Sequence, residues 1–398
     1  MLTDFLVIGG GVIGLNVARD LRRRFTDASV TLIEKEPACG QHASGRNSGV
    51  LHAGFYYSAD SLKARFTRDG NRELTAYCDE RRIPLNRCGK LVVAQTEDEL
   101  AALDELLQRG RKNGVAVEMI SADDARAIEP RARTCGRALY SPTTASVDPV
   151  AVLAAMERDA RAEGVKLECG VSYVSRRNGT VTTSSGTYKA HYVVNAAGLY
   201  ADCIARDFGF SKNYRVLPFK GLYLYSDEPV GAFRTNIYPV PDLRNPFLGV
   251  HFTVTVDGRA KIGPTAIPAL WREQYQGGAN FRFDEFIDIT RRQLGLLARP
   301  DPNFRRLALE EVRKYFRRHM VTRAGALARD VRPEHYRRWG RPGIRAQLFN
   351  IEARRLEMDF VLEGDRRSLH VLNAVSPAFT CSLPFARFVG ETVAQKLH

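Results

Sequence analysis

The beginning of the chain places an apolar strand, a glycine-rich turn and a helix in immediate succession. The segment DFLVIGGGVIGLNVARDLRRR starts with an apolar run over 5–8 and passes into Gly9, Gly11 and Gly14. In this G-x-G-x-x-G pattern the first glycine allows a tight turn, the second lets a pyrophosphate approach the backbone, and the third allows close helix packing. The N–H groups that open the helix then face the phosphates. The pattern predicts a strand–turn–helix unit that binds a dinucleotide.

A second strand supports this interpretation. SVTLIEKE follows the helix, and Glu34 near its end lies twenty residues after Gly14. An acidic side chain there can accept hydrogen bonds from the ribose hydroxyls of an adenosine. We expect Glu34, with Lys35 beside it, to contact the cofactor. A glycine-rich turn without a ligand would leave Glu34 unexplained. FAD and NAD enzymes share this fingerprint, so it leaves the choice of cofactor open.

Composition excludes several classes of protein. The chain has 398 residues and is 44% hydrophobic, which is enough for a large core, so disorder is not expected. Its longest apolar runs fall well short of the eighteen residues of a membrane span. Seven cysteines lie far apart without a CxxC pair, which predicts reduced thiols and no metal site. The N-terminus resembles neither a signal nor a transit peptide, so we expect a cytoplasmic protein.

The segment ASGRNSGVLHAGFYY, residues 43–57, is too polar for a buried strand and too rich in glycine for a stable helix over its whole length. An NAD enzyme usually continues here into another strand–helix–strand unit, whereas this chain has a polar loop. We expect the loop to open a helix through Gly49 and Val50. Small side chains and exposed N–H groups suit a phosphate chain and the polar edge of a flavin. The expected cofactor contacts are Ser44, Arg46, Asn47, Ser48 and Gly49.

A series of motifs, in order from about residue 5 to 380, resembles the L-2-hydroxyglutarate dehydrogenase/oxidase family of D-amino-acid-oxidase-like FAD enzymes. They are GRNSGVLHAGFYY, SLKARF, CGKLVVA, NAAGLYAD, PFKGLY, IYPVPD, FLGVHFT, IGPTA and GIRAQL. The resemblance implies FAD as cofactor. It also implies that the loop 43–57 cradles the pyrophosphate and ribityl chain and brings His52 towards the isoalloxazine ring.

The expected architecture is α/β, or α+β with two domains. A Rossmann-like FAD-binding domain is expected to be discontinuous, over 1–80, 146–212 and 341–398. An antiparallel-sheet substrate domain would take 81–145 and 213–265, and a helical basic insertion 266–340. The sheet is predicted from alternating patterns such as GKLVVAQ, YRVLPFKGLYLYS, FLGVHFTVTVDG and AKIGP.

The resemblance also implies further cofactor contacts. Val171 would meet the adenine through its backbone, and Ala197 and Gly198 would pass close to the dinucleotide. In NAVSPAFTCSLP, Pro377 lies where much of the superfamily has a glycine-rich loop, and its backbone would meet the pyrimidine edge of the flavin. Arg345 is expected to contact the cofactor, the substrate or both.

Oxidation of a 2-hydroxy acid needs a base for the hydroxyl proton while a hydride leaves the carbon. Histidine has a suitable pKa, and the two histidines in the matching motifs are His251 and His52. We predict His251 as base or carboxylate ligand with His52 contributing from the flavin side, and the roles could be exchanged. Lys220 could bind a carboxylate, tune the flavin or be structural. The predicted substrate contacts are Tyr57, Lys220, Tyr238, Arg345 and Thr380.

The resemblance therefore implies FAD-dependent oxidation of L-2-hydroxyglutarate to 2-oxoglutarate, with hydride transfer from Cα to flavin N5. An amine or amino-acid oxidase of the same superfamily is the main alternative. The net charge of +14 suggests a further hypothesis, that the protein is a flavoprotein that modifies nucleic acid. Such a protein would interleave basic and exposed aromatic residues along a groove, whereas these charges concentrate in one insertion, so we expect no nucleic-acid partner. A flavin-binding protein without activity would leave the two histidines unexplained.

The excess positive charge concentrates in residues 301–345, which hold thirteen Arg/Lys and five Asp/Glu. LALEEVRKYFRRHM spaces Leu309, Val312, Phe316 and Met320 as on one helix. The basic residues beside this stripe are Arg313, Lys314, Arg317 and Arg318. They form either a solvated cap or a surface that docks on anionic lipid. Docking on the cytoplasmic face of an inner membrane would let the electrons pass to a membrane quinone, with oxygen as the other candidate acceptor.

Overall fold

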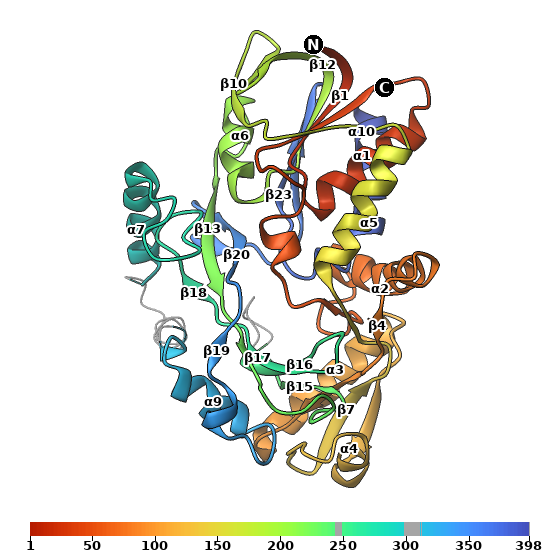
Figure 1. The fold of residues 1–398 in the computed structure, drawn as a ribbon, viewed down its shortest axis with the longest axis vertical. Coiled ribbons are helices and arrows are strands. Elements are labelled where there is room, and N and C mark those ends of the chain that lie inside the picture. Colours follow the sequence, from red (N-terminus) through yellow and green to blue (C-terminus); the bar gives the residue numbers. More distant parts are fainter. Residues whose placement is uncertain (243–248, 298–310, 312, 398) are drawn as a thin grey trace. The chain divides into compact units, whose positions relative to one another are not determined.

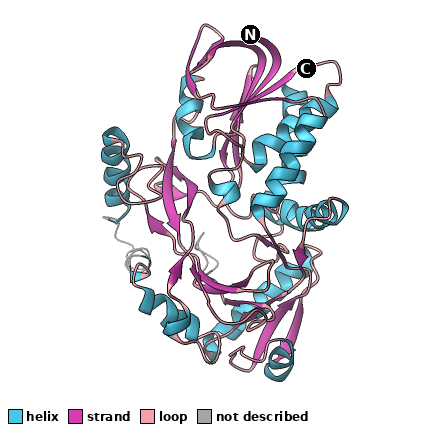
Figure 2. Ribbon diagram, in the orientation of Figure 1, coloured by secondary structure: helices cyan, strands magenta, loops and turns pink. Residues whose placement is uncertain are grey.

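The chain passes four times between two units that have their own internal contacts. This computed structural model describes residues 1–242, 249–297, 311 and 313–397. The first unit comprises Met1–Asn47, Pro149–Pro218 and Arg345–His398, and the second comprises Ser48–Asp148 and Phe219–Ile344. Figure 1 follows the chain through both units, and Figure 2 shows that each combines helices with strands.

An eight-stranded sheet forms the centre of the first unit, with the order β10-β11-β12-β1-β2-β9 and with β23 and β22 continuing from β12. Its strands are β1 (Leu2–Ile8), β2 (Val30–Glu34), β9 (Lys166–Cys169), β10 (Tyr173–Arg177), β11 (Thr180–Thr183), β12 (Gly186–Asn195), β22 (Val361–Gly364) and β23 (Ser368–Asn373). The pairs β12–β1, β1–β2, β2–β9 and β12–β23 are parallel. The predicted Rossmann-like sheet is therefore confirmed.

Helices lie on both sides of this sheet (Figure 1). They are α1 (Val12–Arg24), α5 (Pro149–Ala162), α6 (Ala201–Asp207) and α10 (Ser382–Leu397), with short 3-10 turns at Ala43–Gly45 and Gly198–Tyr200. Helix α1 packs against α5 and α10. Its apolar residues Val12, Leu15 and Leu21 are buried, whereas three arginines end the helix and complement the negative end of its dipole.

A buried arginine joins α1 to α5. Only 4% of the Arg19 side chain is exposed, and its guanidinium lies 3.0 Å from the carboxylate of Asp159 and 2.8 Å from that of Glu163. A desolvated arginine is tolerated only when carboxylates of this kind neutralise it. The pair therefore holds α5 in place against the helix that follows the glycine turn.

The second unit contains another eight-stranded sheet, ordered β19-β14-β17-β16-β15-β5-β7-β6. Its strands are β5 (Lys90–Val93), β6 (Glu118–Ser121), β7 (Arg137–Ser141), β14 (Leu224–Tyr225), β15 (Asn236–Pro239), β16 (His251–Val254), β17 (Ala260–Gly263) and β19 (Arg338–Trp339). All neighbours are antiparallel except β15 and β5, which are parallel. The predicted antiparallel sheet is thus present, with one parallel pair inside it.

Successive side chains of these strands point to opposite faces of the sheet, so the sheet has a hydrophobic core on each face. Leu91 and Val93 join a cluster with Met320 and Val321 of α9, whereas Val92 between them joins Leu103 of α3 in another. The helices of this unit are α2 (Leu62–Glu80), α3 (Leu100–Lys112), α4 (Ala122–Ile128), α7 (Phe283–Leu297) and α9 (Arg317–Gly325), with 3-10 turns at Glu97–Glu99 and Pro333–His335. Because both faces are covered, side chains on either face become strongly desolvated.

Shorter strands complete the fold. Strands β3 (Val50–Leu51), β8 (Ala145–Val147) and β4 (Leu85–Asn86) form a small antiparallel sheet in the second unit. The chain passes between the units within β13 (Tyr214–Gly221) and within β20 (Gly343–Asn350), which also pair with β18 (Ile267–Pro268) and β21 (Arg355–Leu356) respectively.

The unit boundaries differ from the expected domain segments. Residues 48–80 were expected in the cofactor-binding domain, but their contacts assign them to the second unit. The helix expected to run through Gly49 and Val50 is wrong, because Val50 and Leu51 are buried in β3 and pair with Ser146 and Ala145 of β8. A β-branched residue with a ready partner strand favours this extended pairing over a helix.

The basic segment also differs from its prediction. The predicted stripe cannot be followed at Leu309 and Val312, which lie outside the described residues. A turn occupies 314–316, and α9 begins only at Arg317, so one continuous helix to Met320 is wrong. The insertion expected at 266–340 belongs to the second unit, where Met320 is fully buried. Within the described ranges, no helix is long and apolar enough to cross a membrane.

A buried histidine makes the first unit sensitive to acid. His370 on β23 is fully buried, contacts the rings of Phe208 and Phe210, and binds the side chains of Asn195 and Ser368, each at 3.1 Å. Burial lowers the pKa of His370 to about 4, from an ordinary value near 6.5. Between these values the unfolded chain binds the extra proton, so stability rises with pH across this window and is lost as the pH falls from 6.5 to 4.

We predict that His370→Gln flattens this dependence, because one titrating group is removed. The slope of the unfolding free energy against pH should fall by up to about 1.4 kcal/mol per pH unit between pH 4.5 and 6. Urea unfolding at a series of pH values measures the slope. The matched control His191→Gln, at an exposed histidine of the same sheet, should leave it unchanged. Equal slopes in His370→Gln and the parent would contradict the prediction.

Candidate active site

Two of the predicted glycines are required by contacts within the turn after β1. Gly9 has a φ of +110°, and a Cβ there would lie 2.6 Å from the carbonyl oxygen of Ala196. A Cβ on Gly14 would lie 1.9 Å from the carbonyl oxygen of Gly9. Neither clash can be relieved without moving the backbone. The turn therefore brings the start of α1 close to the end of β1.

Glu34 closes this turn from the neighbouring strand. Its side chain is 8% exposed, and its two oxygens accept hydrogen bonds from the backbone N–H groups of Gly10 at 2.6 Å and of Glu36 at 2.9 Å. A carboxylate has further lone pairs that can accept ribose hydroxyls. Lys35 next to it pairs with Glu36 and lies 5.9 Å from the centre of the Tyr200 ring. The acid is thus held at the mouth of the glycine turn.

The polar loop reaches the N-terminus of α1. Ser44 Oγ accepts the N–H of Val12 at 3.0 Å, and a Cβ on Gly11 would lie 3.0 Å from that oxygen. Asn47 donates to the carbonyl of Ser44 at 2.6 Å, and Arg46 donates to the carbonyl of Gln41 at 2.6 Å. The first turn of α1 carries no acidic side chain. This part of the first unit therefore offers N–H and hydroxyl donors to an anion.

The remaining residues predicted for the cofactor in the first unit lie at ends of its strands. Val171 is buried after β9 and donates its N–H to the carbonyl of Glu34 at 2.9 Å. Ala197 follows β12 and donates to the Asn195 side chain at 3.1 Å, and Gly198 has a φ of +54°. Pro377 is buried in the turns between β23 and α10, as is Thr380, which was predicted to bind the substrate, and Arg345 is a half-buried residue of β20.

Two cysteines that are far apart in sequence meet beside Glu34. The sulfurs of Cys39 and Cys169 and a carboxylate oxygen of Glu157 lie within 4.8 Å of one another. A Cβ on Gly10 would lie 2.7 Å from the Cys39 sulfur, so the thiol packs against the glycine turn. Burial raises the pKa of the Cys39 thiol, which stays protonated. Sequence spacing gave no sign of this cluster.

Ser48 and Gly49 belong to the second unit, so the predicted cofactor loop changes units after Asn47. The Ser48 carbonyl accepts a hydrogen bond from Lys261 at 3.0 Å, and the Gly49 carbonyl accepts one from the N–H of Val147 at 2.9 Å. The φ of Gly49 is +77°, a value that favours glycine. These bonds attach the end of the loop to the sheet system of the second unit.

His251 opens β16 and is only 3% exposed. Its Nδ1 lies 2.8 Å from the carbonyl oxygen of Gly249. Because a carbonyl can only accept, Nδ1 carries the proton and Nε2 keeps its lone pair. Burial lowers the pKa of His251 to about 3, the bond to Gly249 opposes this, and the charges of Lys90, Lys314 and Lys261 add to it. The imidazole is therefore neutral at physiological pH and can act as a base.

Tyr238 lies against this imidazole, as the two rings are stacked with centres 3.7 Å apart and an angle of 18°. Tyr238 is 1% exposed. Burial raises the pKa of Tyr238 well above 10, so the hydroxyl stays protonated. The structure thus brings together two predicted site residues, His251 and Tyr238.

Three other predicted residues lie elsewhere in the second unit. His52 is half-buried directly after β3. The carbonyl of Tyr57 accepts a hydrogen bond from Asn113 at 3.0 Å, and the Lys63 ammonium lies 5.9 Å from its ring centre. Lys220 on β13 is 7% exposed, and burial lowers its pKa.

Sequence reasoning missed two buried lysines whose charges act on His251. Lys90 on β5 is fully buried, and burial lowers its pKa to about 7. Lys261 on β17 is 5% exposed, lies 4.7 Å from the centre of the Tyr223 ring, and has its pKa lowered to about 8 by burial. The available signal was a lysine inside an otherwise apolar strand, as in GKLVVA and AKIGP.

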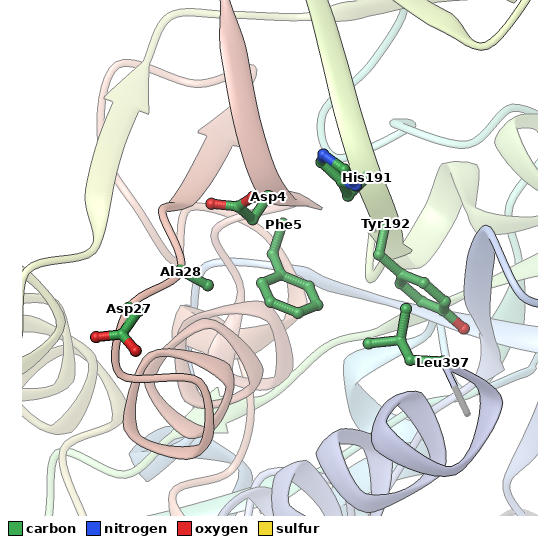
Figure 3. A pocket seen from close by; sticks show the side chains of 7 residues that line it. All are labelled: Asp4, Phe5, Asp27, Ala28, His191, Tyr192 and Leu397. Atoms are coloured by element: carbon green, nitrogen blue, oxygen red, sulfur yellow. The ribbon is translucent and has the colours of Figure 1, made fainter.

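A surface hollow in the first unit lies at the end of the sheet opposite to the glycine turn, so it is not the predicted cofactor site. Figure 3 shows it around Asp4 and Phe5 of β1, His191 and Tyr192 of β12, and Leu397 of α10. Asp4 and Phe5 are near the start of β1, whereas the glycine turn follows its end. Parallel α/β sheets bind their ligands beyond the carboxyl ends of the strands. The hollow is therefore separate from the predicted cofactor residues.

Comparison with known proteins agrees with this geometry. A family model described as FAD dependent oxidoreductase matches residues 4–392. The L-2-hydroxyglutarate dehydrogenase of Escherichia coli strain K12 is 32% identical over 412 residues, covering 98% of this chain and 93% of that protein. The mitochondrial enzyme of the same name from Homo sapiens is 34% identical over 416 residues, covering 99% and 89%. The chain belongs to the L-2-hydroxyglutarate dehydrogenase family of FAD dependent oxidoreductases. The resemblance of the sequence motifs is thereby confirmed.

Solved structures show the same fold in more distant proteins. The L-alpha-glycerophosphate oxidase of Mycoplasma pneumoniae, with FAD bound, has a TM-score of 0.74 at 21% identity and covers 99% of this chain and 95% of its own. The glycine oxidase of Geobacillus kaustophilus has a TM-score of 0.74 at 22% identity, with the same coverage. At these identities the likeness extends to the fold alone.

The residues of the first unit fit FAD. The carboxylate of Glu34 keeps lone pairs that can accept ribose hydroxyls, Gly11 carries no side chain before α1, and the N-terminus of α1 suits the pyrophosphate. The family assignment and this donor set agree on FAD as the cofactor.

We predict that Glu34→Gln weakens FAD binding. The amide keeps one acceptor oxygen but loses the charged hydrogen bonds, each of which contributes about 1–3 kcal/mol, so the dissociation constant should rise about 5- to 150-fold. Titration of the apoprotein with FAD, followed by quenching of flavin fluorescence, measures this constant. Glu36→Gln is the matched control, since that side chain binds Lys35 and His42 instead. Equal constants for Glu34→Gln and the parent would contradict the assigned ribose contact.

Proposed function

We propose that this protein oxidises L-2-hydroxyglutarate to 2-oxoglutarate. The observation that carries the proposal is the 32–35% identity, over 98–99% of the chain, to proteins named L-2-hydroxyglutarate dehydrogenase in bacteria and animals. These relatives favour a 2-hydroxy acid over the amine or amino acid of the alternative prediction. The enclosed, neutral His251 with three lysine charges near it supports a site for an anionic substrate that must lose a proton.

In this proposal His251 is the base. The lone pair of Nε2 takes the proton of the substrate hydroxyl while the carbon–oxygen double bond forms and the hydrogen on Cα leaves with its electron pair. Bound FAD supplies the acceptor for that hydride. The hydrogen bond from Nδ1 to Gly249 and the stack on Tyr238 hold the ring in one orientation. A base held in one orientation reduces the entropy that must be lost in the transition state.

The two carboxylates of the substrate need cationic and hydroxyl partners. We assign Lys220 and Arg345 as candidate carboxylate ligands, with the hydroxyls of Tyr57, Tyr238 and Thr380 as donors. Desolvation of Lys220 strengthens its interaction with any anion that reaches it. His52 remains the second candidate for the base.

The electrons must then reach an acceptor, for which we propose a membrane quinone, with oxygen as the alternative. Several arginines of the basic segment are exposed, including Arg313, Arg318 and Arg323. Phe316 beside them is 68% exposed and Tyr315 is 47% exposed. Exposed aromatic and cationic side chains together suit an anionic lipid surface.

Two of the four basic residues predicted for the lipid-binding surface make contacts within the protein instead. Lys314 is 4% exposed and pairs with Glu311, and Arg317 donates to the carbonyls of Pro333 and Tyr336 at 3.0 and 3.3 Å. Their charges serve internal contacts, so Arg313 and Arg318 carry the proposed lipid contact in this part of the segment.

We predict that L-2-hydroxyglutarate reduces the flavin under anaerobic conditions and that its D-enantiomer, glycine and glycerol 3-phosphate do so far more slowly. His251→Ala should lower the rate of reduction roughly 10²–10⁴-fold, the range of a positioned base. Stopped-flow absorbance of the flavin measures the rate, with FAD content checked for each variant. If His52→Ala abolishes reduction while His251→Ala leaves it intact, the two roles are reversed. Reduction by glycine in preference to the hydroxy acid would refute the proposal.

We predict that the protein sediments with anionic vesicles at low salt and is released as salt rises. Reversal of Arg313 and Arg318 to glutamate should weaken binding by about 2 kcal/mol or more, since each basic residue at the surface contributes about 1 kcal/mol. The control reverses Arg72 and Lys112, which are exposed on α2 and α3 and change the net charge equally. Equal losses in both double variants, or equal binding to neutral vesicles, would exclude a specific lipid surface.

A further inference from the structure

Lys90 has an unusual environment for a lysine. It is 0% exposed, and its ammonium nitrogen has no hydrogen-bond partner within the described part of the chain. Three aromatic rings surround it instead, with centres at 5.0 Å for Phe55, 4.8 Å for Tyr56 and 4.6 Å for Tyr238. The hydroxyl of Tyr56 is likewise buried without a hydrogen-bond partner among the residues that the structure describes. A lysine is rarely buried without a pairing partner, so this arrangement calls for a reason.

The cage connects Lys90 to the proposed base. The Tyr238 ring that contacts the ammonium is also the ring on which the His251 imidazole stacks, at 3.7 Å. Lys90 lies on β5, Tyr238 on β15 and His251 on β16, which are consecutive strands of one sheet. The Tyr238 ring is therefore held between a cation and the imidazole, and removal of the cation would leave it less constrained.

We infer that Lys90 is a positioning residue for His251, which it holds, through the ring of Tyr238, in one orientation and in its unprotonated form. The inference rests on the proposed function, in which His251 is the base.

An aromatic cage suits this role better than a carboxylate partner would. A carboxylate would neutralise Lys90 and would also attract a proton to His251. Ring faces stabilise a cation through their quadrupole without cancelling its charge. The field of Lys90 therefore still acts on His251, whose protonation it opposes.

The other charged groups around His251 differ from Lys90 in this respect. Lys314 also opposes the protonation of His251, but it is paired with the carboxylate of Glu311 and not with the ring of Tyr238. Lys261 keeps its charge but is bound to the carbonyl of Ser48 at 3.0 Å rather than to Tyr238. Only Lys90, among the lysines described here that act on His251, contacts the ring on which the imidazole stacks.

As the pH falls, Lys90 is protonated before His251. Lys90 has a pKa of about 7 and His251 one of about 3. As the pH falls below 7, Lys90 therefore takes its proton first, and its charge then resists the protonation of His251. Removal of the lysine charge should raise the pKa of His251, and acid should then inactivate the base at a higher pH.

The test is Lys90→Met, which keeps the length of the side chain and removes its charge. In the holoenzyme, the acid limb of the pH profile of kcat/KM for flavin reduction should move up by about one pH unit. Lys90→Arg, which keeps a cation in the cage, should restore the limb towards its position in the parent. Lys63→Met is the matched control, because this lysine is also buried in the second unit and contacts the ring of Tyr57 instead.

A second measurement does not depend on turnover. In protein labelled with ¹⁵N-histidine, the His251 resonances, assigned by their absence in His251→Gln, should show a single neutral Nδ1–H tautomer in the parent at pH 6, where Lys90 is charged and His251 is not. In Lys90→Met both tautomers should appear at this pH, and the resonances should move towards the protonated position at a pH about one unit higher than in the parent. Lys63→Met should resemble the parent. If Lys90→Met does not fold, Lys90→Gln provides the same comparison.

The outcomes separate the two proposals. An unmoved acid limb and unchanged His251 resonances in Lys90→Met would overturn the inference, as would equal shifts in Lys63→Met. If L-2-hydroxyglutarate fails to reduce the flavin of the parent, the proposed function fails, while the resonances still decide whether Lys90 positions His251.

Discussion

The buried carboxylate of Glu34 holds together the part of the first unit on which cofactor binding depends. It accepts the N–H of Gly10 from the turn after β1 and that of Glu36 from the end of β2. The same turn is packed so closely that Gly9 and Gly14 leave no room for a side chain. One acidic group thus satisfies buried N–H donors, fixes the mouth of the turn and presents its remaining lone pairs to a ligand. Ser44 Oγ accepts the N–H of Val12 at the start of the helix that follows this turn.

In the first unit a charged carboxylate organises the predicted cofactor site, whereas in the second unit burial sets the charge states of the predicted site residues. Its sheet is covered on both faces, so Lys90, Lys261 and His251 are buried, and burial lowers the pKa of each. In water these groups would be screened and would scarcely influence one another, whereas a buried charge acts strongly on its neighbours. The histidine is kept neutral by this environment and not by a carboxylate. The same environment favours the entry of an anion, because the ammonium of Lys90 has no hydrogen-bond partner among the described residues.

Much of the fold and of the cofactor site could be predicted from local sequence patterns. The glycines, Glu34 and the strand–helix–strand periodicity act over about thirty residues, and steric rules that depend only on neighbouring backbone decide their arrangement. The family motifs added FAD and named His251 and Tyr238 as site residues, whereas their stacking was found only in the structure. Prediction failed where a segment had two possible partners. Val50 and Leu51 could continue a helix or pair with β8, and only the presence of Ser146 and Ala145 beside them decides for the strand.

The basic segment shows that the sequence also did not predict which charged residues lie at the surface. Counting residues placed Lys314 with its neighbours on a cationic surface, but Glu311 and the core of the second unit draw it inside. Lys90 likewise stands out in sequence only as a lysine in an apolar strand, and its proposed role depends on rings from Phe55, Tyr56 and Tyr238. The sequence by itself determined the glycine turn, Glu34 and the family, because the turn and the acid follow a local sequence pattern and the family is recognised from its motifs. Only the tertiary structure decided which cations are buried and which groups they act on, because desolvation and charge coupling depend on what packs around each side chain from distant strands.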